Sequence, residues 1–244
     1  MIFFIPARKG SERVKSKNLR LVSGKPLIEW TFISLKTVLE CRGDDVLVST
    51  DDPGVEILTE QYGFTLKHRP AELAHARATM SDVLFHHAKD FRGHDAVCVL
   101  YPTSPLRTSQ HILKALETWD KFGSSENTLM SVTPVFHRPY GLMKIGDDGF
   151  LQCNRTDGEN YYQAQNMPID YRANGAIYII PSILLNERRI NTQLFNDRTI
   201  PFVMDETAGF EIDIEKEISM AELLMREQTM EKNVLGEIKI GTMA

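Results

Sequence analysis

Short apolar runs rich in β-branched residues alternate along this chain with segments of helical periodicity, and this alternation limits its possible folds most strongly. Parallel strands require long crossover connections, usually helices, which then cover both faces of the sheet. The order of elements therefore predicts an α/β protein with a largely parallel sheet. The expected strands are Ile2–Ile5, Val46–Thr50, Thr65–His68, Ala96–Leu100, Thr128–Val132 and Ala176–Ile180.

Five helices are expected between or after these strands, and most have recognisable end signals. Glycines near the ends of the second and fourth helices, Gly63 and Gly123, favour termination there. The helices are indicated by Pro26, by Asp52-Pro53, by Thr79 with Asp82, by Thr108–Phe122, and by the apolar positions Ile218, Ala221, Leu224 and Met225.

The alternation stops between Pro134 and Asn174. There Leu142–Ile145 and Phe150–Cys153 flank a Gly-Asp-Asp-Gly turn, which is typical of a β-hairpin. We interpret this stretch as an insertion that projects from the sheet. No repeat or linker divides the remainder, so we expect one domain over residues 1–230 with an insertion at 134–174, followed by a C-terminal tail over 231–244.

Composition excludes several classes of protein. The 244 residues carry a net charge of -5, which argues against a nucleic-acid groove as the main binding surface. The three cysteines are far apart, so a CxxC redox pair or zinc knuckle is excluded. No apolar run approaches the roughly 18 residues of a membrane span, and the opening run is too short for a signal peptide. We expect a cytoplasmic protein without a membrane partner.

Charge is distributed unevenly. Residues 8–20, here called the basic loop, hold six basic residues and one acid, whereas residues 205–217, the acidic segment, hold six acids and one base. In an open parallel sheet, ligands bind outside the carboxyl ends of the strands. The basic loop directly follows the first strand and is therefore a candidate site.

The basic loop has the chemistry of a polyphosphate site. Gly10 and Ser11 permit a tight turn whose backbone N–H groups converge on an anion, and Arg8 and Lys17 add charge. The alternative is an ordinary solvated surface loop. The loop matches neither GxGxxG nor GxxxxGK[ST], so the fingerprints of dinucleotide folds and P-loop NTPases are absent.

The acidic segment contains the sequence FEIDIE at Phe210–Glu215. In an extended strand Glu211 and Asp213 would share one side while Ile212 and Ile214 pack inward. Two carboxylates on one side suit Mg²⁺ shared with substrate phosphates. The alternative is an edge strand with a solvated acidic face.

Two further stretches follow strands and carry polar groups. LYPTSPLRT at Leu100–Thr108 presents hydroxyls between two prolines, which suits a nucleotide or polyol but equally a rigid strand-to-helix connection. RPAEL at Arg69–Leu73 places a cation directly after a strand. The seven histidines have no metal-ligand spacing, and no nucleophilic triad is indicated.

Together these stretches resemble the CMP-sialic acid synthetases, the cytidylyltransferase family that includes enzymes for legionaminic and pseudaminic acids. The similarity spans about residues 2 to 225, and six motifs in the family's order are more specific than any one of them. They are IPARKGSERVKSKN at Ile5–Asn18, VSTDD at Val48–Asp52, RPAELA at Arg69–Ala74, PTSPLRT at Pro102–Thr108, ANGAIYI at Ala173–Ile179 and EIDIE at Glu211–Glu215.

The resemblance implies a Rossmann-like nucleotidyltransferase fold, a homodimer formed through the insertion, and specific residue roles. Arg8, Lys17 and Asp213 would be catalytic. The nucleotide would be held by Arg8, Ser11, Lys17, Asn18, Arg69 and Ser81, the sugar by Tyr101, Thr103, Ser104, Gln165, Asn174 and Tyr178, and Mg²⁺ by Glu211 and Asp213.

Three departures from the family pattern concern the sugar and the metal. Tyr101 stands where sialic-acid enzymes commonly have Gln, and the segment at Gln163–Asn166 lacks the arginine that often precedes it. Glu211 replaces the more usual Asp, which leaves coordination plausible. The first two favour a less polar sugar pocket, suited to a deoxy, acylamino-substituted acid of the legionaminic or pseudaminic type.

The function expected from the resemblance is transfer of CMP from CTP to a nine-carbon α-keto acid sugar of the sialic-acid type, with release of pyrophosphate. Mg²⁺ is the expected cofactor, and no side chain is assigned as general base. Two alternatives remain open: a related transferase that uses Kdo, an 8-amino analogue or another nucleotide, and a non-catalytic nucleotide-binding homologue.

Overall fold

The computed structural model describes residues 1–135, 142–153 and 168–241, with side chains described as far as residue 230. Seven strands form one sheet in the order β11-β7-β10-β6-β1-β4-β5. The strands are β1 (Ile2–Ala7), β2 (Leu21–Val22), β3 (Lys25–Pro26), β4 (Asp45–Thr50), β5 (Thr65–His68), β6 (Ala96–Val99), β7 (Leu129–Pro134), β8 (Met143–Ile145), β9 (Leu151–Cys153), β10 (Tyr171–Pro181) and β11 (Ile200–Val203).

The predicted parallel sheet is confirmed. β1 pairs in parallel with β4 and β6, β4 with β5, and β7 with β11, whereas β10 runs antiparallel to both of its neighbours. The six predicted strands are all present in it. β11 at the sheet edge and the small β2-β3 ribbon were not predicted. β2 and β3 have only two residues each, and β11 is defined by its pairing with β7.

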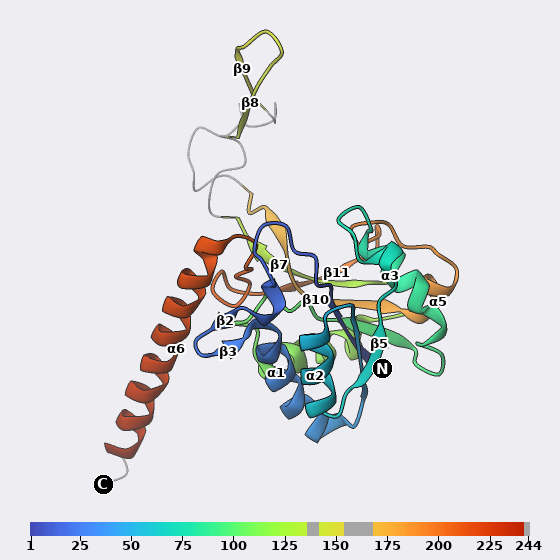
Figure 1. Ribbon diagram of the computed structural model, residues 1–244. Coiled ribbons are helices and arrows are strands. Elements are labelled where there is room, and N and C mark those ends of the chain that lie inside the picture. Colours follow the sequence, from blue (N-terminus) through green and yellow to red (C-terminus); the bar gives the residue numbers. More distant parts are fainter. Residues whose placement is uncertain (136–141, 154–167, 242–244) are drawn as a thin grey trace.

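Helices cover both faces of the sheet (Figure 1). The helices are α1 (Leu27–Arg42), α2 (Pro53–Gln61), α3 (Met80–His86), α4 (Ser109–Phe122), α5 (Ser182–Asn186) and α6 (Glu215–Gly241), with short 3-10 turns η1 (Lys17–Leu19), η2 (Ala71–Leu73) and η3 (His87–Lys89). The predicted ends hold: Asp52 caps α2, Gly123 closes α4, and Thr79 and Asp82 form a reciprocal capping box at α3.

The core has two halves because successive residues of β1 face opposite sides of the sheet. Phe3 and Ile5 pack with apolar residues of α1, α2 and α4, while Ile2 and Phe4 pack with residues of α3 and α5. This two-sided burial explains why the central strands are continuous apolar runs without alternation.

The acidic segment departs from the prediction. Residues 210–214 are not part of any strand; they connect to α6, which begins at Glu215. Ile212 is fully buried as expected, but Ile214 is 44% exposed. The segment has no strand neighbour to pair with, so the strict two-residue alternation assumed for FEIDIE does not apply.

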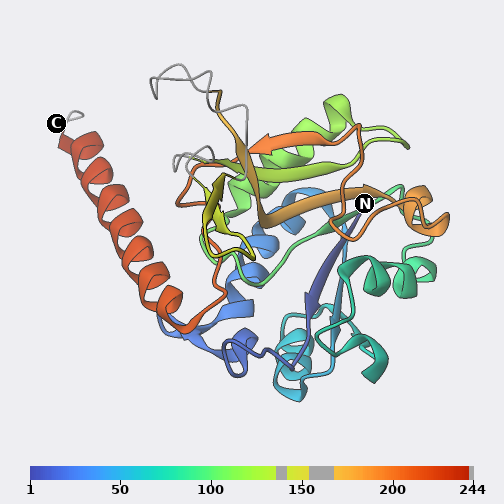
Figure 2. The same cartoon turned by 90° about the horizontal axis from the view of Figure 1, so that it is seen from above.

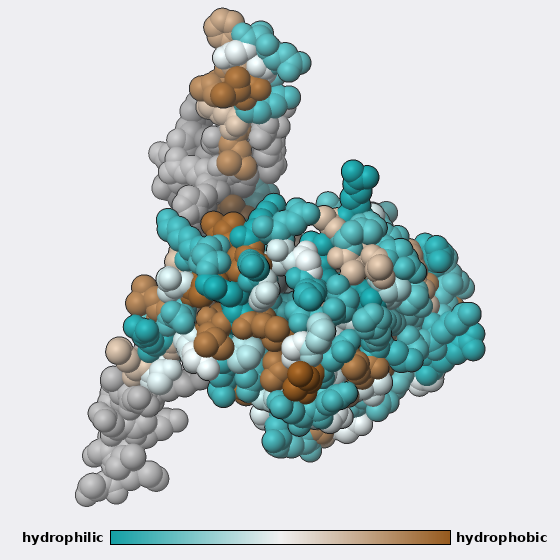
Figure 3. Space-filling model, in the orientation of Figure 1, coloured by the Kyte–Doolittle hydropathy of each residue, from teal (hydrophilic) through white to brown (hydrophobic). Residues whose placement is uncertain are grey.

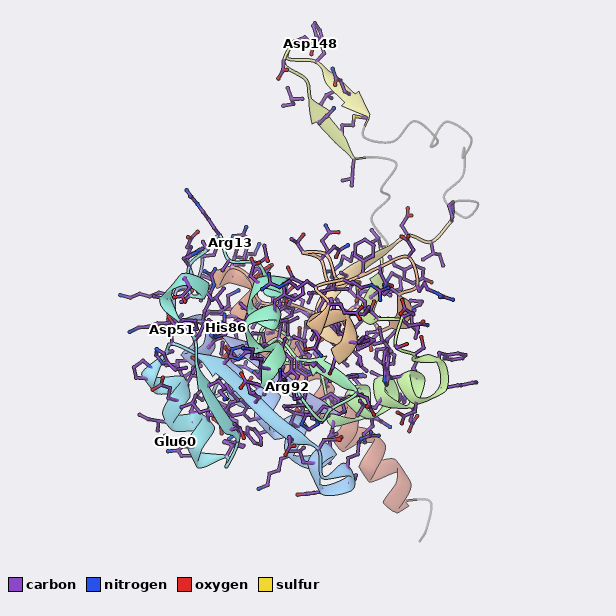
Figure 4. All side chains as sticks on the ribbon, turned by 90° about the vertical axis from the view of Figure 1, so that its right-hand side faces the viewer. Arg13, Asp51, Glu60, His86, Arg92 and Asp148 are labelled. Atoms are coloured by element: carbon purple, nitrogen blue, oxygen red, sulfur yellow. The ribbon has the colours of Figure 1, made fainter. Side chains whose placement is uncertain are left out.

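The predicted hairpin is present as β8 and β9, which pair antiparallel from Met143–Cys153 to Ile145–Leu151. It lies clear of the domain, and Asp148 at its tip is far from the other labelled side chains in Figure 4.

Helix α6 leaves the domain as one rod (Figure 2) and continues without a break past residue 230, where we placed the start of a tail. Among the described residues, no helix combines the length and apolar character needed to cross a membrane.

Candidate active site

A cavity of about 210 Å³ lies at the carboxyl ends of the parallel strands. Its walls come from the loops that follow β1, β5 and β6, together with the start of α3. This is the location that an open parallel sheet predicts for a ligand. The predicted site residues in its lining are Arg8, Ser11, Lys17, Asn18, Arg69, Tyr101 and Thr103.

The basic loop is held in shape by hydrogen bonds to its own backbone. Asn18 Nδ2 donates to the Arg8 carbonyl at 3.0 Å, and the Lys9 N–H donates to Asp51 Oδ1 at 2.7 Å. Arg8 and Lys17 are partly buried and line the cavity, whereas Lys9 and Lys15 are exposed. The loop therefore presents two of its cations to the cavity and the others to solvent, which the solvated-loop alternative does not predict.

Arg69, in the loop after β5, supplies a third cation to the cavity. Its side chain is only 3% exposed, and its guanidinium donates from Nε to Ser49 Oγ at 3.3 Å and from Nη2 to the Ser49 carbonyl at 3.1 Å. Burial lowers the pKa of Arg69 to about 10, and the charge of Arg8 acts in the same direction while Asp51 opposes it. In the described part of the chain, no carboxylate forms an ion pair with either arginine, so both cations remain available to an anion.

The acidic segment meets the basic loop at the edge of this cavity. Lys17 Nζ lies 2.9 Å from Asp213 Oδ1 and 3.0 Å from the Ile212 carbonyl oxygen. The hydroxyl of Thr103 donates to Glu211 Oε1 at 2.9 Å. Burial raises the pKa of Glu211, and the neighbouring charge of Asp213 raises it further. Because burial and the charge of Asp213 disfavour the charged form of Glu211, a cation placed beside Glu211 would be stabilising.

The side chain of Asn174 makes its hydrogen bonds within the sheet. It is fully buried; its Oδ1 accepts from Ser131 Oγ at 2.5 Å and from the Ala176 N–H at 3.1 Å, and its Nδ2 donates to Thr133 Oγ1 at 2.9 Å. These bonds hold the irregular stretch of β10 where its register against β7 shifts. Asn174 thus shapes the strand, and the sugar contact expected of it stays a prediction.

Gly175 links that irregular stretch to the acidic segment. Its φ of +70° is a conformation that side-chain-bearing residues rarely adopt, and a Cβ at this position would lie 2.9 Å from Glu211 Oε1. The Asn-Gly pair therefore creates the space that the Glu211 carboxylate occupies.

Two tyrosines pack against each other near Glu211, and one of them, Tyr101, lines the cavity. The rings of Tyr101 and Tyr178 pack edge to face with centroids 5.7 Å apart. Burial raises the pKa of Tyr178 to about 12, assisted by the charge of Glu211, and burial likewise raises the pKa of Tyr101. Both phenols are therefore neutral hydrogen-bonding groups at physiological pH.

Besides Asn174, Tyr178, Glu211 and Asp213, three more of the predicted residues are not in the cavity lining. Ser81 is 3% exposed in the first turn of α3, where its Oγ lies 2.9 Å from Thr79 Oγ1. Ser104 is 1% exposed, and its Oγ finds no hydrogen-bond partner within the described ranges. Gln165 lies outside the residues that the structure describes.

Arg107 belongs to the site's support and was given no role from the sequence. It is fully buried; Nη1 donates to the carbonyls of Tyr101 at 3.0 Å and Ala176 at 2.7 Å, and Nη2 donates to Thr31 Oγ1 at 2.7 Å. Arg107 thus ties the loop after β6 to β10 and α1. The arginine inside PTSPLRT was the available signal, but its partners lie up to 76 residues away.

Comparison with known proteins defines the family. The family model described as cytidylyltransferase matches residues 2–239. The chain belongs to the cytidylyltransferase family. In this member of the family, the match includes every loop that builds the cavity, and the resemblance deduced from the six motifs is confirmed.

Relatives of this cytidylyltransferase act on different sugars. CMP-N,N'-diacetyllegionaminic acid synthase of Legionella pneumophila is 31% identical over 234 residues, which cover 94% of this chain and 95% of the relative. N-acylneuraminate cytidylyltransferase of Escherichia coli is 26% identical over 234 residues, which cover 95% of this chain but 54% of the relative. The chain thus spans about half the length of the Escherichia coli protein.

Solved structures confirm the fold. CMP-2-keto-3-deoxy-manno-octonic acid synthetase complexed with CTP superposes with a TM-score of 0.66 at 19% identity, covering 93% of this chain and 98% of that one. A 4-diphosphocytidyl-2C-methyl-D-erythritol synthase from Anaerococcus prevotii superposes with a TM-score of 0.60 at 14% identity, covering 92% and 97%. The Rossmann-like nucleotidyltransferase fold is therefore the fold of this family member.

Proposed function

We propose that the protein transfers CMP from CTP to a sialic-acid-type α-keto acid sugar and releases pyrophosphate. The observation that carries the proposal is that Arg8, Lys17 and Arg69 line one cavity, while Asp213 and Glu211 bond to Lys17 and Thr103 in its wall. Cations on one side suit the phosphates, and carboxylates on the other suit a divalent ion. The printed names of the relatives supply the class of sugar.

In the proposed reaction the anomeric hydroxyl of the sugar attacks the α-phosphorus in line, and the bond to the pyrophosphate oxygen breaks. Arg8 and Lys17 oppose the negative charge that develops on the leaving group. Arg69 and Asn18 would hold the nucleotide, and Thr103, which lines the cavity and donates to Glu211, would lie where nucleotide and sugar meet. Catalysis by this chain is thus positioning and charge neutralisation.

The residues present fit the Mg²⁺ that the resemblance implies. Glu211 and Asp213 offer hard oxygen ligands, and the pKa of Glu211 is raised by burial and by Asp213, so a bound cation would relieve their repulsion. When bound, the ion supplies positive charge beside the phosphates and lowers the pKa of the attacking hydroxyl. The described residues contain no cluster of three acidic, histidine or cysteine ligands, so the remaining ligands would be substrate oxygens and water.

We propose a sugar of the legionaminic or pseudaminic type. Tyr101 replaces the amide of the Gln usual in sialic-acid enzymes with an aromatic ring and a neutral hydroxyl, and it packs edge to face with Tyr178. Such an aromatic pair complements a deoxy carbon better than a hydroxyl, because a buried hydroxyl without a partner is costly.

A pyrophosphate-release panel tests both levels of the proposal. CTP, UTP, GTP and ATP are combined with sialic, legionaminic, pseudaminic and Kdo-type acids, with Mg²⁺ or with EDTA. We expect turnover with CTP and Mg²⁺, and a higher kcat/KM for the deoxy acids than for sialic acid. A tenfold preference for sialic acid would refute the sugar assignment, turnover with Kdo alone would support the Kdo alternative, and absence of turnover with every pair would indicate a non-catalytic homologue.

The active assembly is proposed to be a cytoplasmic homodimer that forms through the insertion. Apolar side chains on the β8-β9 hairpin are exposed in the single chain, including Ile145 at 74% and Phe150 at 73%. In Figure 3 the projecting hairpin carries brown, apolar residues beside teal, hydrophilic ones. Exposed apolar groups on a projecting hairpin are typical of a surface that another chain covers.

A further inference from the structure

A series of hydrogen bonds leads from Lys67, whose side chain is partly exposed, to the buried Arg69. Ser49 Oγ lies 2.9 Å from His87 Nε2, and His87 Nδ1 lies 2.8 Å from Asp90 Oδ2. Lys67 Nζ lies 2.7 Å from the other oxygen of Asp90. At its inner end, Ser49 Oγ accepts from Arg69 Nε at 3.3 Å.

The hydrogen directions in this series of bonds follow from its outer end. Asp90 is a carboxylate held by Lys67 and can only accept, so His87 Nδ1 carries a hydrogen and donates it to Asp90. In a neutral ring Nε2 is then an acceptor, to which Ser49 Oγ donates its hydroxyl hydrogen. Ser49 Oγ in turn accepts from Arg69, which can only donate.

The geometry of a serine, a histidine and an aspartate does not make this a nucleophilic centre. Ser49 is 0% exposed and His87 is 2% exposed, so no substrate reaches either of them. Burial lowers the pKa of His87, and Arg69 and His86 act in the same direction, while Asp90 opposes them. A neutral imidazole in one tautomer is the state that the buried surroundings favour.

This series of hydrogen bonds acts on the side chain of Arg69. Its guanidinium lines the cavity, and within the described residues Ser49 is its sole side-chain partner, since Nη2 bonds to the Ser49 backbone and Nη1 is left for a ligand. An arginine stem has several rotatable bonds, and a single neutral hydroxyl with a free rotor fixes it poorly. A hydroxyl whose own hydrogen is already committed to His87 presents its lone pair in one direction.

We propose that Ser49, His87 and Asp90 are positioning residues that orient Arg69 toward the nucleotide through a single ordered tautomer. This rests on the proposed function in one respect, namely that the cavity binds a nucleoside triphosphate. The series of hydrogen bonds forms without a ligand. The tautomer of His87 can therefore be tested separately from nucleotide binding.

The first test reads the tautomer without any ligand. Nitrogen-15 NMR of histidine-labelled protein is expected to show His87 protonated at Nδ1 and free at Nε2. In Asp90→Asn, Lys67 retains the amide oxygen, so the NH₂ group faces His87 and the imidazole is expected to switch to the Nε2–H tautomer. A native Nε2–H tautomer, or a protonated ring at pH 7, would overturn the proposal.

The second test is a double-mutant cycle on the Kd for CTP, measured by calorimetry with EDTA and without sugar. Ser49→Ala is expected to weaken CTP binding about fivefold, the equivalent of one hydrogen bond. Arg69→Met is expected to weaken it more, and adding Ser49→Ala to Arg69→Met is expected to change nothing further. Asp90→Asn, an isosteric change outside the cavity, is expected to weaken binding in the same direction as Ser49→Ala.

The control is Thr59→Val, which removes a fully buried hydroxyl whose bond runs to the Val55 carbonyl at 2.8 Å in α2. It is expected to lower the melting temperature comparably to Ser49→Ala and to leave the Kd unchanged. An equal loss of affinity in the Arg69→Met background would show that Ser49 acts without Arg69 and would overturn the proposal. Native protein that shows the predicted tautomer yet binds no CTP would instead overturn the proposed function and, with it, the role of Arg69.

Discussion

At the scale of single residues, Gly175 has the most direct influence on the site. Gly175→Ala forces an alanine into φ +70° and places its Cβ 2.9 Å from Glu211 Oε1. We expect a loss of about 1–2 kcal/mol in the free energy of unfolding. Displacement of Glu211 adds a fall of roughly ten- to a hundredfold in kcat/KM, measured by pyrophosphate release.

Gly63→Ala is the matched control for this change. Gly63 has the same φ of +70°, but a Cβ there has no neighbour within 4 Å. The control should lose similar stability and keep its kcat/KM. Similar activity in the two variants would show that Gly175 does not set the position of Glu211.

Some cations of the basic loop line the cavity and others point to solvent, which gives a second prediction for single residues. Arg8→Ala removes a charge-assisted contact with phosphate worth roughly 1.5–3 kcal/mol, so kcat/KM should fall roughly ten- to two-hundredfold. Lys15→Ala removes an exposed cation and should change kcat/KM less than twofold. Equal, small effects from both variants would favour a solvated loop over a phosphate site.

The sequence predicted the charged residues of the site but not the residues whose hydrogen bonds support the site. Arg8, Lys17, Glu211 and Asp213 are recognisable because charge of one sign clusters locally. The supporting contacts of Arg107 join positions that have no local pattern in common. Such contacts arise from the folded chain, so composition and spacing do not reveal them.

At the scale of elements, the start of α3 offers a stability prediction. Thr79 Oγ1 accepts from the Asp82 N–H at 3.2 Å, and Asp82 Oδ2 accepts from the Thr79 N–H at 3.0 Å. Thr79→Ala should lower the free energy of unfolding by about 1 kcal/mol in denaturant titrations at pH 7.

This capping box also has a predicted pH dependence. Hydrogen bonds from the Thr79 side chain and backbone lower the pKa of Asp82 from its ordinary 3.8. The stability from that carboxylate is therefore complete above about pH 4 and is lost as the pH falls through the lowered value. The difference between native and Thr79→Ala should shrink in that range. Thr118→Ala, which removes a hydroxyl inside α4, should show no such change.

Helices with capping residues of their own could be predicted from the sequence. Strands that form only because another strand lies beside them could not. The capping residues Asp52, Thr79 and Thr108 act within four residues of themselves, so their helices can be located from the sequence. β11 is a strand because β7 lies beside it, and residues 210–214 are not a strand because no such neighbour exists. Alternation of side chains alone does not distinguish these two cases.

At the scale of the whole molecule, the exposed hairpin predicts the oligomeric state. Phe150→Glu places a charge on an apolar surface that we propose lies between two chains, so light scattering at micromolar concentration should show a monomer. Phe122→Glu is the control, because Phe122 is 55% exposed at the end of α4, away from the hairpin. A dimer in both variants, or a native monomer with full activity, would contradict the proposed interface.

The ion pair between Lys17 and Asp213 joins residues 196 positions apart and has a consequence for how the protein is made. A nascent chain that has left the ribosome as far as β10 already contains the basic loop, Arg69 and both tyrosines, but neither carboxylate. The cationic half of the site is therefore synthesised first and stays without its acidic counterpart until residues 211–213 emerge. Chains interrupted during translation before residue 211 would be able to attract phosphates, yet they would lack the carboxylates needed to use them.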